Sequence, residues 1–224
     1  KMKERLGLNR SNIILMDQTH NIIGRKGDFS SAKTIAENSI TLVKNKNELL
    51  PLQVDPSEKF YVIDLYDGPN NHNESNVTIK LREHGYKVNS FQIDKSDSLV
   101  IANHILEQIP KDALVFLNAY ASPVEWKDNI FLPSVQADFI NRLIQQCDKV
   151  VITSFGSPYL IQDFPDAPVY ICAYKGSEIM QQALLGALMG ESDINGILPI
   201  TIPGIAKIGD GIQIKSNKWP QRQE

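Results

Sequence analysis

The sequence is poor in cysteine and histidine. Of its 224 residues, two are cysteine and four are histidine. Cys147 and Cys172 lie in apolar surroundings and neither belongs to a CxxC motif, which predicts buried free thiols and excludes a disulfide framework. A single disulfide between them remains an alternative, so the two cysteines do not indicate the cellular compartment. No two histidines have metal-ligand spacing, so we expect surface or structural roles for them and no metal site.

An excess of positive charge is also missing. The chain carries 23 Lys and Arg against 26 Asp and Glu, a net charge of −3, which argues against a nucleic-acid partner. No apolar run approaches the roughly 20 residues of a membrane span. The chain begins at a lysine without a signal peptide, so its location stays unknown from these residues. The apolar content (42%) and the charged content (22%) are those of a globular protein.

Short apolar runs alternate with helical patterns after residue 58. The apolar runs are typical of buried strands and span 60–66, 86–93, 113–120, 149–156 and 168–174, followed by a last extended piece over 196–203. Amphipathic helices are expected over 76–85, 96–110, 133–147 and 177–190. Strands that are apolar on both faces and separated by helices predict a three-layer α/β/α sandwich with a mostly parallel, five- or six-stranded sheet.

Several residues are expected to set the ends of these helices. Gly85 is placed to end one of them in the left-handed conformation, and Gly190 is expected to end another. Ser96 or Asp97 is the expected cap of the helix that stops at Pro110.

The N-terminal part has a different pattern. Residues 36–52, "AENSITLVKNKNELLPL", predict an amphipathic helix with no strand in front of it to pack on. Residues 1–12 are typical of the tail of a helix whose own domain is missing. We therefore expect a linker and helix tail over 1–29, the sandwich over 30–204 and a polar tail over 205–224.

Common catalytic motifs are absent. The sequence contains no GxGxxG, GxxxxGK[ST] or HExxH pattern. The stretch "SFGSPY" (154–159) lacks the second glycine of a GxSxG nucleophile elbow, and Pro158 follows Ser157 directly. These residues favour a tight turn over a nucleophilic serine.

Carboxylates near strand ends are the natural catalytic candidates, because ligands of an open α/β sheet bind at the carboxyl edge. Asp67 follows the first predicted strand, while Glu125 and Asp128 lie in the long connection over 121–134. Glycoside hydrolysis uses two carboxyl groups that flank one sugar. The sequence pairs no two of these acids, and each alone is more typical of a solvated loop residue.

Aromatic residues gather at or just past the predicted strand ends. They are Tyr66, Tyr120, Trp126, Tyr159 and Tyr174. Aromatic rings in such positions can line a binding site and stack on the apolar faces of sugars. They can equally seal the end of the sheet or contact another domain, and the sequence leaves these alternatives open.

Four segments follow one another along the chain: "KERLGLN" (3–9), residues 36–52, "SFGSPYLI" (154–161) and "GESDINGILPITIP" (190–203). Together they resemble the C-terminal domain of glycoside hydrolase family 3, with the bacterial β-N-acetylglucosaminidase branch as the nearest. "KERLGLN" (3–9) is similar to the helix that leaves the catalytic barrel of that family. Residues 36–52 resemble the opening of its second domain, and "GESDINGILPITIP" (190–203) resembles its closing segment. "SFGSPYLI" (154–161) is similar to a Phe-Gly-Asn-Pro-Tyr turn, with Ser157 in the place of the asparagine.

The resemblance implies a six-stranded sandwich with one antiparallel strand, attached to an enzyme that removes terminal β-linked sugars with retention of configuration. It places the nucleophilic aspartate, and a histidine–aspartate acid/base dyad, on a (β/α)₈ barrel that these 224 residues do not include. The chain is therefore expected to be inactive alone, to brace the barrel and to line part of its sugar pocket. The implied partners are this barrel and a β-linked amino sugar or cell-wall fragment. No cofactor is implied, and the parent enzyme would be periplasmic or a lipoprotein.

The expected substrate-lining or domain-contact residues are Asp67, Tyr120, Trp126, Ser157, Tyr159 and Tyr174. In the β-glucosidase branch of the family a glutamate of the second domain serves as the acid, which makes Glu125 a weak catalytic candidate. The remaining alternatives are a stand-alone carbohydrate-binding module and a purely structural one.

Overall fold

The computed structural model describes residues 1–9, 23–53, 55, 57–68, 73–121 and 132–217. The chain divides into two compact units, residues 1–35 and 36–224. In the first unit, helix α1 (Met2–Arg5) buries none of its residues. Helix α3 spans Lys26–Ser39. Asp28 lies in its first turn and accepts hydrogen bonds from the backbone N–H and the guanidinium of Arg25. An acidic side chain in the first turn stabilises a helix through its dipole.

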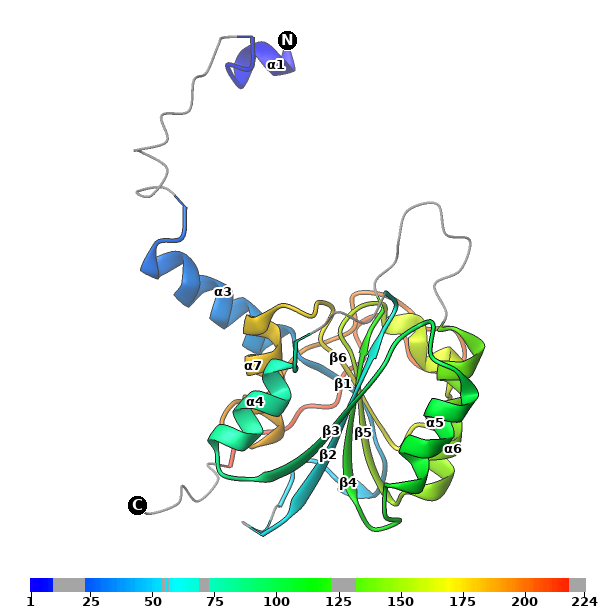
Figure 1. Ribbon diagram of the computed structural model, residues 1–224. Helices are drawn as coiled ribbons and strands as arrows, with labels where there is room; N and C mark the ends of the chain where they lie inside the picture. The colour runs from blue at the N-terminus through cyan, green and yellow to red at the C-terminus, as the bar shows by residue number, and fades with distance from the viewer. Residues whose placement is uncertain (10–22, 54, 56, 69–72, 122–131, 218–224) are drawn as a thin grey trace. The chain divides into compact units, whose positions relative to one another are not determined.

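A six-stranded sheet forms the centre of the second unit, in the order β1-β6-β5-β4-β2-β3. Its strands are β1 (Thr41–Asn45), β2 (Lys59–Tyr66), β3 (Lys87–Ile93), β4 (Leu114–Tyr120), β5 (Lys149–Ser154) and β6 (Val169–Cys172). Strands β2 to β6 pair in parallel, whereas β1 is antiparallel to β6. The mostly parallel α/β fold predicted from the sequence is confirmed (Figure 1).

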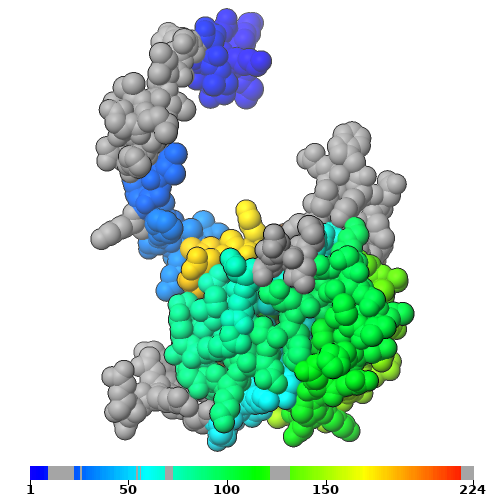
Figure 2. Space-filling view, viewed as in Figure 1, coloured from blue at the N-terminus to red at the C-terminus, as the bar shows by residue number. Residues whose placement is uncertain are grey.

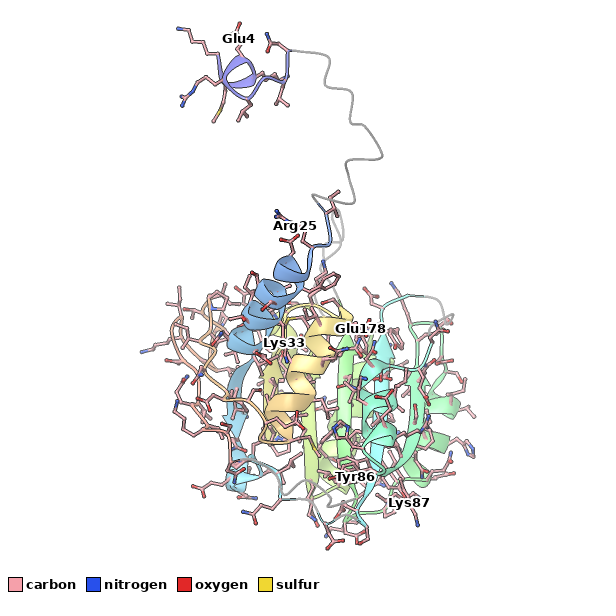
Figure 3. The ribbon with its side chains drawn as sticks, turned by 90° about the vertical axis from the view of Figure 1, so that its left-hand side faces the viewer. Glu4, Arg25, Lys33, Tyr86, Lys87 and Glu178 are labelled. Carbon is pink, nitrogen blue, oxygen red and sulfur yellow. The ribbon has the colours of Figure 1, made fainter. Side chains whose placement is uncertain are left out.

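Helices cover both faces of this sheet (Figure 1). Helices α5 (Leu99–Glu107) and α6 (Ser134–Gln146) lie on one face, and α4 (Asn76–Glu83) and α7 (Glu178–Leu188) lie on the other. Alternate strand residues enter the two cores, so that Ile63 packs on the α5/α6 side and Val62 on the α4/α7 side. Figure 3 shows α7 and α4 lying over the sheet, and Figure 2 shows the surface that α4, β3 and α5 form.

The predicted helix over 36–52 is wrong beyond Ser39, because Thr41–Asn45 form strand β1. Thr41 pairs with Cys172 and Asn45 with Val169, so this segment occupies the free edge of β6. Leu42 is fully buried on the α4/α7 side of the sheet. Pairing with a strand that is distant in sequence thus overrides the local helical pattern.

The predicted extended piece over 196–203 lies outside the sheet. It is joined to its surroundings by isolated bridges, such as that between Ile202 and Ala206. Leu198 and Ile202 are buried all the same. Pro199 and Pro203 lack the backbone N–H that a ladder needs, and the sixth strand comes from the N-terminal side instead.

Glycines end two of the helices as the sequence predicts. Gly85 follows α4 with a φ of 81°, and the N–H of Tyr86 bonds to the Leu81 carbonyl at 3.1 Å. Gly190 follows α7 with a φ of 72°, and the N–H of Glu191 bonds to the Gly186 carbonyl at 2.8 Å. Both prediction and structure follow from the ease with which glycine adopts the left-handed conformation.

The predicted cap of α5 is wrong by one or two residues, since Ser98 precedes the helix. Asp97 and Ser96 instead form hydrogen bonds in the turn that precedes the helix. Asp97 accepts a hydrogen bond from the Asp94 N–H at 2.8 Å, and the N–H of Ser96 donates to Asp94 Oδ1 at 2.6 Å. These short-range bonds form a turn between β3 and α5, so the helix begins only after it.

Both cysteines are buried and free, as predicted. Burial raises the pKa of Cys147 to about 11 and that of Cys172 to about 12. Of the described histidines, His84 caps the end of α4 with Nδ1 2.7 Å from the Lys80 carbonyl oxygen. His104 is exposed on α5. Within the described ranges, no cluster of three His, Cys, Asp or Glu side chains could hold a metal, and no helix is long and apolar enough to cross a membrane.

The segment after α7 returns along the outer edge of β1. The Ile212 N–H bonds to the Leu42 carbonyl at 2.8 Å, and Ile194 bridges Ile214. Asp193 accepts from Lys215 Nζ at 2.7 Å and from the Ser216 N–H at 2.8 Å. These hydrogen bonds hold the pKa of the Asp193 carboxyl well below its usual range.

Asp193→Ala is expected to loosen this segment locally. Because the Asp193 side chain is partly exposed to solvent, we expect the amides of Ile194 and Ile214 to exchange only about 2- to 5-fold faster in the variant than in the wild type at pH 7. A carboxyl group whose pKa is lower in the folded state stabilises the fold at pH values above its pKa in the unfolded chain. This stabilisation is lost as the pH falls from there through the pKa of the folded state. The difference in Tm between the two proteins should therefore narrow below about pH 4. Glu107→Ala, on the exposed side of α5, is the control. Exchange rates of Ile194 and Ile214 that are the same in Asp193→Ala as in the wild type would contradict the prediction.

Candidate functional site

The carboxyl edge of the parallel strands holds the predicted site residues that lie in the described part of the chain. Tyr120 ends β4, Ser157 and Tyr159 follow β5, Tyr174 follows β6 and Asp67 follows β2. Asp67 lies 3.7 Å from Lys95 Nζ. Glu125 and Trp126 fall outside the described residues, as does Asp128.

Three aromatic rings stack in a column along this edge. Tyr66 and Tyr120 are register partners on β2 and β4, with ring centroids 4.8 Å apart and planes 11° from parallel. Phe155 lies on the other side of Tyr120, also at 4.8 Å and at 7°. Both faces of the Tyr120 ring are thus covered by other rings. Such stacked pairs stabilise beyond the area that they bury.

The turn after strand β6 packs tightly against this column. A side chain at Gly176 would place its Cβ 2.6 Å from the Tyr120 ring, so only glycine fits there without a shift. Two residues earlier, Tyr174 has a φ of 61°, which is rare for an aromatic residue. Its hydroxyl is 2.8 Å from Thr41 Oγ1. Tyr174 therefore joins the carboxyl end of β6 to the start of β1.

The turn after strand β5 is held by its own serines. Ser154 Oγ donates to the Ser157 carbonyl at 2.8 Å, and Ser157 Oγ accepts from the Tyr159 N–H at 3.3 Å. Ser157 caps the 3-10 helix η2 (Pro158–Asp163) and is 4% exposed. The tight turn predicted for "SFGSPY" is confirmed. Tyr159 is half-buried and packs against the core of the α5/α6 side.

A buried carboxylate lies below the aromatic column, at a position that the sequence reasoning missed. Asp64 on β2 is fully buried, and its Oδ1 accepts from Asn118 Nδ2 at 2.8 Å. Burial is the main cause that raises the pKa of Asp64 to about 6, with a smaller contribution from the charge of Glu74. The signal was present in the sequence, because Asp64 and Asn118 are the polar residues inside two otherwise apolar strand runs.

These contacts define the chemistry that this edge can perform. Asp64 is out of reach of a ligand in solvent, so it can hold or release a proton but cannot attack a sugar. Burial also raises the pKa of the Tyr66 and Tyr120 hydroxyls above the ordinary range, which keeps both neutral. The described part of the edge is therefore a packed, mostly uncharged end of a sheet, which suits contact with another surface.

Residues 40–218 match the family model described as the glycosyl hydrolase family 3 C-terminal domain. The chain belongs to this family. No curated protein matches the chain. Among solved structures, the β-glucoside phosphorylase BglX bound to 2FGlc superposes with a TM-score of 0.70 at 24% identity, over 90% of this chain.

Two further solved structures are similar over 90% of this chain, each at 21% identity. They are a β-N-acetylglucosaminidase of Paenibacillus sp. str. FPU-7, with a TM-score of 0.67, and a β-glucosidase of Listeria innocua in complex with laminaribiose, with a TM-score of 0.64. This chain spans 36% of the phosphorylase, 37% of the acetylglucosaminidase and 30% of the glucosidase. These likenesses establish the fold that is shared with longer enzymes.

Proposed function

We propose that this domain supports the catalytic barrel of a retaining, exo-acting β-N-acetylglucosaminidase. The observation that carries the proposal is the family match over 40–218, in a chain that spans about a third of its enzyme neighbours. The barrel would supply the nucleophile and the acid/base pair, because no motif for either was found in the 224 residues. The domain would brace that barrel and line one side of its sugar pocket.

The proposed contact surface is the carboxyl edge of the sheet. The "SFGSPYLI" turn supports this choice, since it lies at that edge and carries the resemblance to the acetylglucosaminidase branch. The residues proposed to line the sugar or to meet the barrel are Asp67, Tyr120, Trp126, Ser157, Tyr159 and Tyr174. Tyr120 would act by supporting its neighbours, because its two ring faces are already covered.

A second candidate is a β-glucosidase domain that contributes an acid to the shared site. The similarity to the Listeria innocua β-glucosidase favours this alternative, and Glu125 is its candidate residue. A third candidate is a sugar-binding module that works alone through Tyr159, Tyr174 and Trp126. Titration calorimetry with chitobiose would give saturable heat for the third candidate, and Trp126→Ala would abolish that heat.

The 224-residue chain alone is expected to be inactive on 4-nitrophenyl N-acetyl-β-glucosaminide and on 4-nitrophenyl β-glucoside. Enzymes accelerate their reactions by roughly 10⁶-fold or more, so even a small active fraction would exceed the buffer rate. Release of 4-nitrophenol at pH 5 to 7 is the measurement. Activity that Glu125→Gln abolishes would refute the supporting role and assign the acid to this domain.

The polypeptide encoded by the whole reading frame separates the two sugar specificities. The proposal expects hydrolysis of the N-acetylglucosaminide in preference to the glucoside. It also expects a large loss of activity when residues 40–218 are deleted. Preference for the glucoside would replace the amino-sugar assignment and leave the supporting role in place.

A further inference from the structure

Asn195 is followed directly by Gly196, and this is the one Asn-Gly pair in the sequence. Asparagine loses ammonia most readily before glycine, because glycine has no side chain to hinder the reaction and its backbone turns freely. The Gly196 nitrogen gives up its proton and bonds to Asn195 Cγ, while the side-chain amide takes up a proton and leaves as ammonia. Water then opens the resulting five-membered imide to aspartate or, as the main product, to isoaspartate.

The structure exposes the Asn195 side chain but holds the nitrogen that would attack it. Gly196 is buried, and its N–H donates to the Ile40 carbonyl oxygen at 3.0 Å. Ile40 is itself fully buried, directly before strand β1. The attack needs the Gly196 nitrogen to lose its proton and to turn toward the Asn195 side chain. The hydrogen bond to Ile40 therefore has to break before the reaction can begin.

The backbone is fixed on both sides of Asn195. Ile194 exchanges two backbone hydrogen bonds with Ile214, at 2.9 and 3.1 Å. On the other side, Gly211 approaches so closely that a Cβ on it would collide with the Gly196 carbonyl oxygen. Rotation of the Asn195 backbone into the geometry of the imide ring therefore requires that these residues separate.

We propose that Asn195 is a deamidation site that reacts only when the segment 193–216 opens from the outer edge of β1, and that isoaspartate formation makes this opening irreversible. In the closed arrangement the Ile212 N–H bonds to the Leu42 carbonyl of β1 at 2.8 Å. Opening of the segment uncovers this edge, and modification of Asn195 keeps it uncovered.

The modified chain cannot return to the closed arrangement, because its backbone is too long. Isoaspartate directs the main chain through its side-chain carbon, which adds one atom between Ile194 and Gly196. In the folded domain the N–H groups of these two residues bond to Ile214 and to Ile40. The added atom changes the spacing of the two N–H groups, so they no longer match both acceptors. The close contacts of Gly196 leave no room for a bulge that would restore the match.

The rate of modification follows from the opening equilibrium. When the segment closes faster than the imide forms, the rate equals that of a free peptide multiplied by the open fraction. The Ile194 amide exchanges through the same opening, because its hydrogen bond to Ile214 must also break. A change that favours the open state should therefore raise the rates of exchange and of deamidation by the same factor.

Incubation of the 224-residue chain at pH 7.5 and 37 °C, followed by peptide mass spectrometry, measures the products at Asn195. A synthetic peptide of residues 190–201 gives the rate without the fold. We expect the chain to react at least about 10-fold more slowly than the peptide. Asn195→Gln, whose imide ring would need six members, is the control and should form no product at this position. Equal rates in chain and peptide would overturn the proposal, since the hydrogen bond to Ile40 would then give no protection.

Asp193→Ala tests whether opening controls the reaction. Asp193 anchors the segment through Lys215 and Ser216, and we expect its loss to raise both the exchange of Ile194 and the formation of product about 2- to 5-fold. The 190–201 peptide with the same substitution corrects for any direct effect on the chemistry, and Glu107→Ala should change neither rate. Faster exchange without faster modification would overturn the link between the two.

The isoaspartate fraction of the incubated chain tests whether the opening is irreversible. We expect the amides of Ile194 and Ile212 to lose their protection from hydrogen exchange in this fraction. Asn195→Asp carries the same charge on a main chain of normal length, so it should keep that protection. Protection equal to that of the wild type in the isoaspartate fraction would overturn the irreversible step.

Discussion

Gly196→Ala is expected to destabilise the domain by about 3 kcal/mol, because two backbone segments touch at this position. A Cβ on Gly196 would lie 2.5 Å from Thr41 Oγ1 and 2.7 Å from the Ile40 carbonyl carbon, and closer still to the Ile40 carbonyl oxygen. The segments cannot simply move apart, since the Gly196 N–H donates to that oxygen at 3.0 Å. Urea unfolding at pH 7 would show the loss as a lower midpoint with an unchanged slope.

Gly186→Ala is the matched control for this substitution. Gly186 lies inside α7, and its nearest non-local neighbours would be Ser192 Oγ at 3.6 Å and Glu191 Oε2 at 3.7 Å, which is ordinary contact. Alanine is favoured over glycine in a helix by about 1 kcal/mol, so this variant should be more stable than the wild type. A similar effect of both substitutions would show that the segments at Gly196 do not approach as closely as the structure has them.

The contact at Gly196 also shows why strand β1 could not be predicted from the sequence, whereas most of the parallel strands could. Strands β2, β4, β5 and β6 were predictable because a strand buried on both faces is a short apolar run, such as residues 60–66 or 113–120. Strand β1 was not, because Thr41–Asn45 is short and mixed in polarity. Its structure depends on pairing with β6 and on the close approach of residue 196, which lies more than 150 positions away in the sequence.

The candidate site was predictable in location but not in arrangement. The positions of Tyr120 and Tyr174 at strand ends follow from the strand pattern alone. The covering of Tyr120 by Tyr66 and Phe155 depends on register, which pairs Tyr66 with Tyr120 and Ala119 with Ser154, the residue before Phe155. Asp64 was hidden for a different reason. The apolar residues around Asp64 predict a strand, but this pattern assigns no role to the single carboxylate within it.

Tyr120→Ala is expected to have the largest effect on stability, a loss of about 4 kcal/mol at pH 8. The substitution removes the middle ring of the column, so Tyr66 and Phe155 each lose a stacked neighbour at 4.8 Å. Gly176 cannot fill the gap, since it has no side chain, and the surrounding strands are fixed by their ladders. Chemical unfolding monitored by far-UV circular dichroism would measure the loss.

Tyr120→Phe separates the ring from its hydroxyl. The phenylalanine ring keeps both stacked contacts, and the hydroxyl that it removes is buried and has no hydrogen bond to the described residues. At pH 8, where Asp64 is ionised, we therefore expect this variant to lie within about 1 kcal/mol of the wild type. A loss as large as that of Tyr120→Ala would mean that the hydroxyl, and not the column of rings, holds this end of the sheet together. A small loss in both variants would mean that the column is dispensable, and the proposed contact surface for the barrel would then have to rest on the turns after β5 and β6.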